Sequence, residues 1–342
     1  MSLRRPLLRG LAIAAAVVLV PVVGVTQAHA VAPGAITNLK VFTHVGAVTF
    51  SWDLPAGLDP MDTTTRTLIQ AKLGTVPPAT PTDGVLDSDA VSCAGAEQAV
   101  HVCAPGDVTW IDGLDPGVDF AFSFFVVNSQ GTSAKVSTVL RATDLALSAS
   151  ATTVTYGGWT TFKAQLRRTG SGGGLNGAKV DFYVREHGTR AWYFWEEKTT
   201  VSGVATSRFR PGLRLDVQAF FYGTNNDLGS SASGTTIDVR NKVVGSVNFS
   251  SRKKGKSFTI RGTVSSKSPG SSVWIERYTK GKWQRVKTVR LTGVKTSKGT
   301  TAGNVKYTVK PKKKGKYSYR ITTPPSKRYV VSHSGAIRFR VK

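Results

Sequence analysis

Hydrophobic and polar residues alternate with a period of two wherever the chain shows a regular pattern. Val48, Phe50 and Trp52, for example, alternate with Thr49 and Ser51. No window of useful length shows the i, i+3, i+4, i+7 spacing of an amphipathic helix, so short half-buried strands between turns are predicted. Further rows of the same kind are Phe120, Phe122, Phe124 and Val126; Thr160, Phe162, Ala164 and Leu166; Phe258, Ile260, Gly262 and Val264; Val305, Tyr307 and Val309; and Ile337, Phe339 and Val341.

Strands of this length, separated by turns rich in Gly, Pro, Ser and Thr, are typical of antiparallel β-sandwiches. The chain has 342 residues, which at roughly 100 to 150 residues per domain allows two or three domains. We therefore expect an all-β protein made of three tandem antiparallel β-sandwiches. The expected boundaries are 1–30 for a signal peptide, then 31–144, 145–242 and 243–342 for the three modules.

The first module carries three pieces with recognisable motifs: VTFSWDLP at 48–55, GLDPG at 113–117 and FAFSF at 120–124. On these pieces, residues 34–142 resemble a fibronectin type III domain. The resemblance implies that Trp52 fills the core of the sandwich. Phe120 stands where the family usually has Tyr, so the hydrogen bond of that tyrosine is lost while its packing is retained.

The second and third modules resemble each other. The alternating run at 157–166 aligns with the run at 255–264, and Pro211 aligns with Pro311. Residues 145–240 also resemble the bacterial Ig-like repeats of secreted actinobacterial proteins, through LALSAS at 145–150 and TVTYG at 153–157. Two homologous Ig-like modules are therefore expected, of which the third is a basic version of the second.

The first 30 residues have the parts of a secretory signal peptide. Arg4, Arg5 and Arg9 are followed by an apolar stretch at 11–25 and by Ala-His-Ala at 28–30. A membrane anchor is the alternative, but the stretch is shorter than the roughly 20 residues that span a bilayer. We expect cleavage after residue 30 and a secreted, extracellular protein that is associated with the cell envelope and does not span the membrane. The export route, general secretory or twin-arginine, stays open.

Cys93 and Cys103 are the only cysteines, ten residues apart in the exported part. In an oxidising compartment they most simply form one disulfide, while a metal pair is the alternative.

The positive charge is concentrated in one module. The whole chain has 46 Lys and Arg against 20 Asp and Glu, and residues 243–342 contain 26 of these bases and a single acid, Glu276. Because the alternating apolar residues point inward, the bases on the strands point outward, and the module is expected to bind a polyanion. A charged face that serves solubility is the alternative. The candidate polyanion-binding residues are Lys306, Lys310, Lys312, Lys313, Lys314, Lys316, Arg338 and Arg340.

Two further features suggest chemistry or binding only weakly. A Gly-x-Gly-x-x-Gly match at 172–177 is followed by a strand pattern rather than by a helix, so we interpret it as a loop. Asp83, Asp87 and Asp89 lie in a loop, where solvation or a loose Ca²⁺ site would explain them. The histidines are scattered over all three modules, and no nucleophile motif occurs. We expect no catalytic residue, no metal and no cofactor.

Four aromatic residues stand consecutively at 192–195. Since Trp195 aligns with Val286, Tyr193 and Trp195 are expected to face the core and Trp192 and Phe194 to face outward. The outward pair would cover a hairpin or a neighbouring module, or would form an aromatic platform for sugar rings or a partner protein.

The composition and motifs favour a secreted, non-enzymatic modular binding or scaffold protein, held at the cell envelope by its basic module. Its expected partner is an anionic cell-wall polymer or an anionic membrane surface, with no specific nucleic acid and with protein or glycan contacts through the first two modules. The alternative is an accessory carbohydrate-binding protein of extracellular polymer degradation. An enzyme with an unrecognised site is a third hypothesis.

Overall fold

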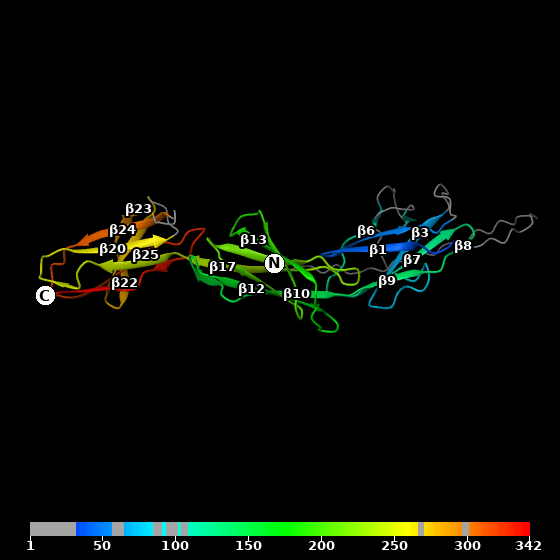
Figure 1. The fold of residues 1–342 in the computed structure, drawn as a ribbon, viewed down its shortest axis with the longest axis horizontal. Coiled ribbons are helices and arrows are strands. Elements are labelled where there is room, and N and C mark those ends of the chain that lie inside the picture. The colour runs from blue at the N-terminus through cyan, green and yellow to red at the C-terminus, as the bar shows by residue number, and fades with distance from the viewer. Residues whose placement is uncertain are drawn as a thin grey trace, which may run out of the picture.

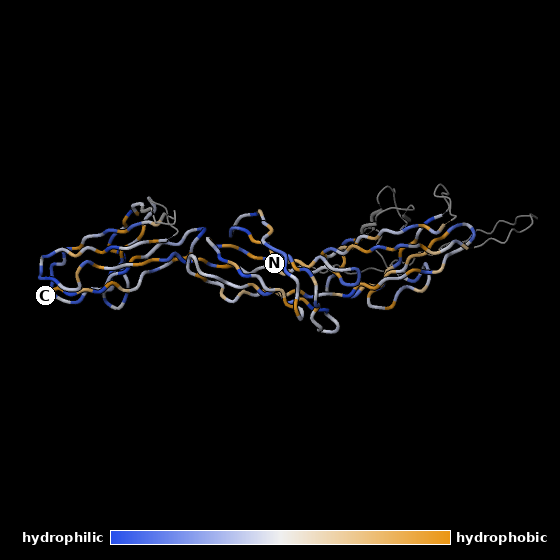
Figure 2. Tube along the Cα trace, in the orientation of Figure 1, coloured by the Kyte–Doolittle hydropathy of each residue, from blue (hydrophilic) through white to orange (hydrophobic). Residues whose placement is uncertain are grey.

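The computed structural model describes residues 32–56, 65–84, 91–93, 102–103, 109–265, 270–295 and 301–342. Every regular element within these ranges is a β-strand, and three separate hydrophobic cores lie in a row along the long axis (Figure 1). Hydrophobic and hydrophilic residues alternate along the strands of each core (Figure 2). The prediction of an all-β chain of tandem antiparallel sandwiches is confirmed.

The first module is a sandwich of two antiparallel sheets. Trp52 is 2% exposed and its ring centroid lies 5.5 Å from that of Phe124, so its predicted place in the core is confirmed. Phe120 is also buried and stacks on Phe122. One sheet has the order β1 (Thr37–His44), β2 (Ala47–Asp53), β6 (Thr109–Ile111) and β4 (Val91–Cys93). The other has the order β5 (Val102–Cys103), β3 (Arg66–Leu73), β7 (Phe120–Asn128) and β8 (Gly131–Thr132), with β9 (Val136–Leu140) also paired to β7.

The two cysteines end strands of opposite sheets, because Cys93 is the last residue of β4 and Cys103 the last of β5. Their side chains lie outside the described part of the structure, as do residues 1–31 with the expected signal peptide and Asp87 and Asp89 of the aspartate-rich loop. The disulfide and the cleaved leader therefore stay predictions. A bond between Cys93 and Cys103 would link the two sheets of the first module.

The second and third modules share the order of their common strands, as their sequence similarity predicts, and the third adds β23 to its smaller sheet and β26 to its larger one. In the second, β10 (Thr143–Ala149), β12 (Thr160–Arg168) and β15 (Val204–Phe209) form one sheet. The larger sheet has the order β11 (Thr153–Thr155), β17 (Ser230–Arg240), β16 (Leu215–Phe221), β13 (Lys179–Glu186) and β14 (Tyr193–Thr199). The glycine-rich segment forms the loop between β12 and β13, in agreement with our interpretation.

In the third module, β18 (Lys242–Val247), β20 (Phe258–Ser265), β24 (Thr301–Val309) and β23 (Thr292–Lys295) form the smaller sheet. The larger sheet has the order β19 (Ser251–Arg252), β27 (Ile337–Val341), β25 (Gly315–Thr323), β21 (Ser272–Thr279) and β22 (Lys282–Arg290), with β26 (Ser332–His333) paired to β25.

A turn of the second module joins it to the first. The turn between β16 and β17 runs beside the segment that links the two modules: Leu228 N–H donates to the Arg141 carbonyl at 2.8 Å, and Arg141 N–H donates to the Asn226 carbonyl at 2.8 Å. Leu228 is 1% exposed and belongs to the core of the first module. Gly223 has a positive φ of 92° and no space for a Cβ beside Thr43, which allows the close approach.

The corresponding turn of the third module, between β25 and β26, makes the second joint in the same way. Val330 N–H donates to the Val239 carbonyl at 3.0 Å, and Arg214 N–H donates to the Arg328 carbonyl at 2.8 Å. The Arg328 guanidinium also pairs with Glu186 at 2.7 Å. Each turn thus supplies backbone partners for the preceding module or linker, and the three modules form a continuous rod (Figure 1).

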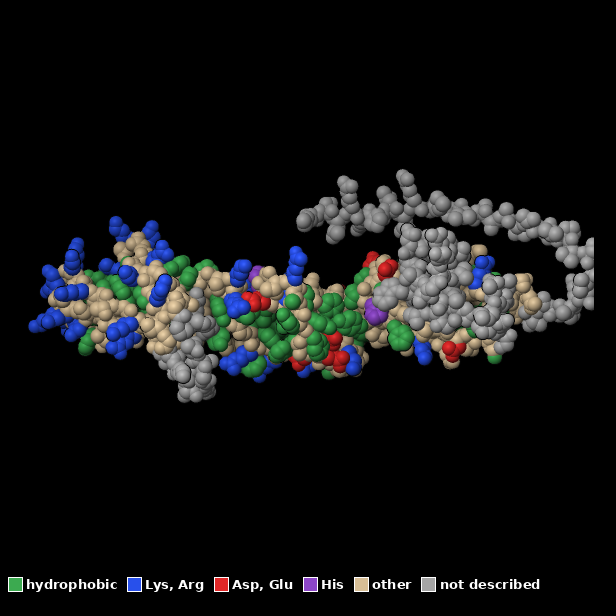
Figure 3. All heavy atoms as spheres, turned by 90° about the horizontal axis from the view of Figure 1, so that it is seen from above, with side chains coloured by type: hydrophobic (Ala, Val, Ile, Leu, Met, Phe, Trp, Pro, Cys, Tyr) green, Lys and Arg blue, Asp and Glu red, His purple; other side chains and the backbone are tan. Residues whose placement is uncertain are grey.

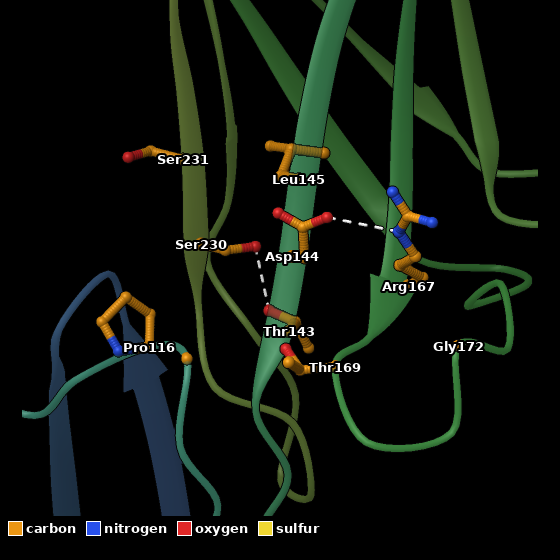
Figure 4. Close-up of a pocket in the computed structure, with 10 residues that line it drawn as sticks. Pro116, Thr143, Asp144, Leu145, Arg167, Thr169, Gly172, Ser230 and Ser231 are labelled. Carbon is orange, nitrogen blue, oxygen red and sulfur yellow. Dashed lines mark hydrogen bonds and ion pairs between the residues drawn. The ribbon is translucent and has the colours of Figure 1, made fainter.

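A hollow of about 470 Å³ lies beside the first joint, lined by Pro116 and Gly117 of the first module and by residues of the second (Figure 4). Thr143 Oγ1 donates to Ser230 Oγ at 2.9 Å, and Arg167 pairs with Asp144 at 3.2 Å. These four side chains thus bind one another in two pairs, and the charges of Arg167 and Asp144 neutralise each other.

Replacing Leu228 with Ala should weaken the first joint and the first module together. Truncation of a buried leucine costs about 2 to 5 kcal/mol, so we expect the first module of the full chain to unfold at a lower temperature in calorimetry. Val201→Ala is the control, because Val201 is 73% exposed on the second module. If Leu228→Ala and Val201→Ala unfold alike, the turn does not stabilise the first module.

Candidate functional site

Three lysine-rich turns of the third module meet at the end of the rod that lies away from the joint. Antiparallel pairing places them there, because Gly315 pairs with Val341 and Lys254 N–H donates to the Lys342 carbonyl at 3.0 Å. Figure 3 shows Lys and Arg side chains gathered at this end. The exposed lysines of this surface, which we call the cationic end, are Lys253, Lys254, Lys256, Lys280, Lys282, Lys310, Lys312, Lys313, Lys314 and Lys342.

The eight predicted polyanion-binding residues are all exposed, and the structure places them in three groups. Lys310 and the lysines at 312–314 belong to the cationic end. Lys316, Arg338 and Arg340 lie on the larger sheet, where Lys316 is the cross-strand neighbour of Arg340. Lys306 lies on the outer face of the smaller sheet, so the eight residues surround the module and do not share one surface.

Lys306 faces a second base that the sequence pattern did not single out. Arg261 on β20 lies directly opposite Lys306 on β24, and both line a shallow hollow of about 540 Å³. Ser246, Thr263 and Asn304 add uncharged hydrogen-bonding groups to the same hollow. Like charges directly opposite on neighbouring strands repel each other, so an anion seated between them would relieve this repulsion. Finding Arg261 required the strand register, which a sequence without its structure does not provide.

The single acid of the third module is used inside the module. The Glu276 carboxylate accepts hydrogen bonds from Arg320 Nε at 2.6 Å and from Thr322 Oγ1 at 2.7 Å, and it is largely buried. Burial raises the pKa of Glu276, but the hydrogen bonds from Thr322 and Arg320 and the charge of Arg320 outweigh it and hold the pKa below its usual value. Glu276 therefore neutralises one arginine of the sheet and none of the lysines of the cationic end.

The predicted orientation of the aromatic run at 192–195 is only partly correct. Phe194 points outward and is 57% exposed, as expected. Tyr193 lies opposite Val184 on the core side of the sheet, as expected, but on this edge strand it is 63% exposed. Trp195 packs edge-on against Phe209 with ring centroids 4.5 Å apart, and yet stays 44% exposed. The reason is an irregularity in the pairing of β13 with β14, where Trp195 is the extra residue of an edge strand. Trp192 is half-buried beneath the Arg185 guanidinium, 4.4 Å from its ring centre.

The remaining titratable groups form no metal-binding cluster within the described ranges, where no three His, Cys, Asp or Glu side chains come together. In the second module His187 Nδ1 lies 2.7 Å from Asp216, and in the third module His333 Nδ1 lies 2.9 Å from Thr322 Oγ1. No helix long and apolar enough to cross a membrane occurs in the described part of the chain.

Comparison with known proteins adds little to this description. Neither a protein-family model nor a curated protein matches the sequence. Among solved structures, the chicken CNTN1 FN1-FN3 domains are similar over 90% of this chain and 99% of that chain, at 12% identity and a TM-score of 0.21. The native conformation of E. coli alpha-2-macroglobulin is similar over 91% of this chain and 23% of that chain, at 12% identity and a TM-score of 0.25. The chain thus spans about a quarter of the length of the latter, and neither likeness bears on function.

The buried acid makes the third module sensitive to acid. Because the folded-state pKa of Glu276 lies below its usual value of 4.5, its contribution to stability is complete above that pH and is lost as the pH falls through the folded pKa. We expect Glu276→Gln to lower the stability of this module at neutral pH by about 1 to 3 kcal/mol and to remove this part of its pH dependence. Denaturant unfolding of the full chain between neutral and acidic pH measures both effects.

Glu197→Gln is the matched control, since Glu197 is an exposed ion-pair partner on the second module. Parallel stability curves for the parent and Glu276→Gln would contradict the assignment.

Proposed function

We propose that this chain is a secreted, non-enzymatic binding or scaffold protein whose third module holds it at the cell envelope by binding a polyanion. The observation that carries the proposal is the cationic end, where exposed lysines from three turns form a surface with no acid. The only acid of the module, Glu276, is engaged with Arg320 and Thr322. The resemblance of the second module to bacterial Ig-like repeats of secreted actinobacterial proteins supports export and a modular scaffold.

A dense set of exposed lysines binds polymers of negative charge mainly by releasing their counterions. Such binding tolerates many polymer sequences, so it suits a repetitive polymer such as a polyol-phosphate chain of the cell wall, or an anionic lipid surface. Lysine side chains on turns carry charge without the fixed fork of arginine, and they contact phosphates as point charges. The geometry of these lysines therefore supports attachment to the envelope.

The position of the surface at one end of the rod gives the attachment a direction. The cationic end lies away from the joint with the second module, and the backbone bonds of both joints hold the modules in a row. Binding through this end would leave the first and second modules exposed as spacers or contact modules.

Binding should fall steeply with salt. If about six anionic groups are neutralised, affinity for a nucleic-acid-like polyanion should weaken about a thousandfold between about 50 and 200 mM salt. We expect a comparable trend for soluble poly(glycerol phosphate) and for vesicles with anionic lipid, measured by titration of the full chain. Binding that ignores salt would exclude electrostatic attachment.

Charge-reversal variants distinguish binding by the cationic end from binding by the net charge of the module as a whole. Lys254→Glu, Lys280→Glu and Lys313→Glu together alter the cationic end, whereas Lys287→Glu, Arg290→Glu and Arg338→Glu make the same change in net charge on exposed strand positions. The first triple variant should lose more affinity and more of the salt dependence than the second. Equal losses would show that the positive charge acts only as a whole and that the cationic end is no site.

A further inference from the structure

Four aromatic rings form a continuous row on the outer face of the larger sheet of the second module. Tyr222, Phe220, Tyr183 and Phe194 contact one another in that order, with successive ring centroids 5.9, 5.5 and 5.7 Å apart. We call this row the aromatic strip. It crosses β16, β13 and β14 on the outer face of the sheet, whereas Phe182 on the inner face belongs to the core. Figure 3 shows hydrophobic side chains gathered over the middle module. Phe194 and Tyr222 are 57% and 43% exposed, so the strip keeps open ring surface.

The fold does not require the aromatic strip. In the third module, which has the same order of common strands, the cross-strand pair that corresponds to Tyr183 and Gln218 is Glu276 and Arg320. Thr322 occupies the position that corresponds to Phe220. An ion pair and a threonine thus occupy these positions in a homologous sandwich. The rings that the third module carries on the same face, Trp274 and Trp283, are covered by the guanidinium groups of Arg285 and Arg320, which lie 5.1 and 4.6 Å from the ring centres. The open row of rings in the second module therefore needs another explanation.

Hydrogen-bonding groups lie on both sides of the aromatic strip. On one side Asp181 is the cross-strand neighbour of both Phe220 and Glu197. Burial and the charge of Glu197 raise the pKa of Asp181, while Lys179 pairs with Glu197 at 3.0 Å. On the other side Gln218 is the neighbour of Tyr183, and the next row contains the ion pair of Arg185 with Asp216.

The hydroxyl groups of two rings add to this polar set. Tyr183 Oη lies 3.1 Å from Tyr222 Oη, so the strip itself carries a hydrogen-bonded pair that can donate and accept. Flat apolar surface beside carboxylate, amide and phenol groups is the combination that a sugar needs: its C–H face packs on a ring while its hydroxyls bond to the flanks.

We infer that the aromatic strip is a binding site for an uncharged polysaccharide chain. Glu197 and Asp216 already pair with Lys179 and Arg185, and Asp181 adds a further carboxylate, so the flanks offer no excess positive charge to a polyanion and this site differs in ligand class from the cationic end. A second copy of the protein, face to face on the strip, would bury the carboxylates of both copies near one another, which is costly. A protein partner would require an interface of roughly 1,000 Å², whereas the strip is bounded by charged side chains on both sides.

Titration of the full chain with soluble hexamers of β-1,4-linked glucose and of N-acetylglucosamine tests the inference. We expect one of the two to bind with equal affinity at low and high salt, because the contacts are not ionic. Phe194→Ala should weaken this binding about tenfold, through loss of one stacked ring. Phe220→Thr, which installs the residue of the third module, should have a similar effect.

Tyr193→Ala is the control, because Tyr193 is 63% exposed but lies on the side of Val184, away from the strip. Failure of both hexamers to bind, or binding of Phe194→Ala as tight as the parent, would overturn the inference. Sedimentation that finds the parent as a dimer and Phe194→Ala as a monomer would also overturn it, since the strip would then be a contact between two copies of the protein. Charge reversal at Lys254, Lys280 and Lys313 should leave hexamer binding intact, so this inference and the proposed function can fail separately.

Discussion

The arrangement of the whole molecule depends on one repeated contact, the backbone pairing between the turn of each later module and the segment or module before it. At the first joint Leu228 N–H donates to the Arg141 carbonyl and Arg141 N–H donates to the Asn226 carbonyl. At the second joint Val330 N–H donates to the Val239 carbonyl. Linker segments without partners behave as flexible coils, but these linkers have their polar groups satisfied by the neighbouring module. The joints therefore turn three small sandwiches into one extended body.

The joints also separate the charges of the molecule. The third module carries nearly all of the net charge of +26, and its lysine-rich turns lie at the end opposite its joint. Fields between exposed charges are screened over about 8 to 10 Å at physiological salt, which is shorter than a sandwich module. The acids of the first module consequently do not compete with a polyanion for the cationic end, and the acids beside the aromatic strip act only locally.

Most of the cores follow from the alternation of hydrophobic residues. Phe50, Trp52 and Phe162 lie where the period of two places them, because inward positions of a sandwich recur at every second residue. Tyr193 also lies on the core side, opposite Val184, but it stays exposed because its strand is at the edge of the sheet, and no sequence signal marks an edge strand. The motifs of the first module were similarly reliable for the fold, and they were silent on any ligand.

The contacts that arise between distant segments could not be read from the sequence. Leu228 is an apolar residue in a polar turn, and only the structure shows that it joins the core of the first module. Leu140 of that core precedes Leu228 by nearly 90 residues in the chain. The pair of Arg261 and Lys306, and the row of Tyr222, Phe220 and Tyr183, depend on strand register and on which strands are neighbours. Alternation predicts that these side chains point outward, but not what they meet there.

The pairing at the joints has a mechanical consequence. The strands and the turn segments at the joints lie roughly along the long axis in Figure 1, so their hydrogen bonds run across it. A pulling force between the two ends would load these bonds in shear, and several would have to break at once before a module could swing or slide away. Under tension the molecule should behave as a stiff strut up to that threshold rather than as a chain of loosely tethered beads.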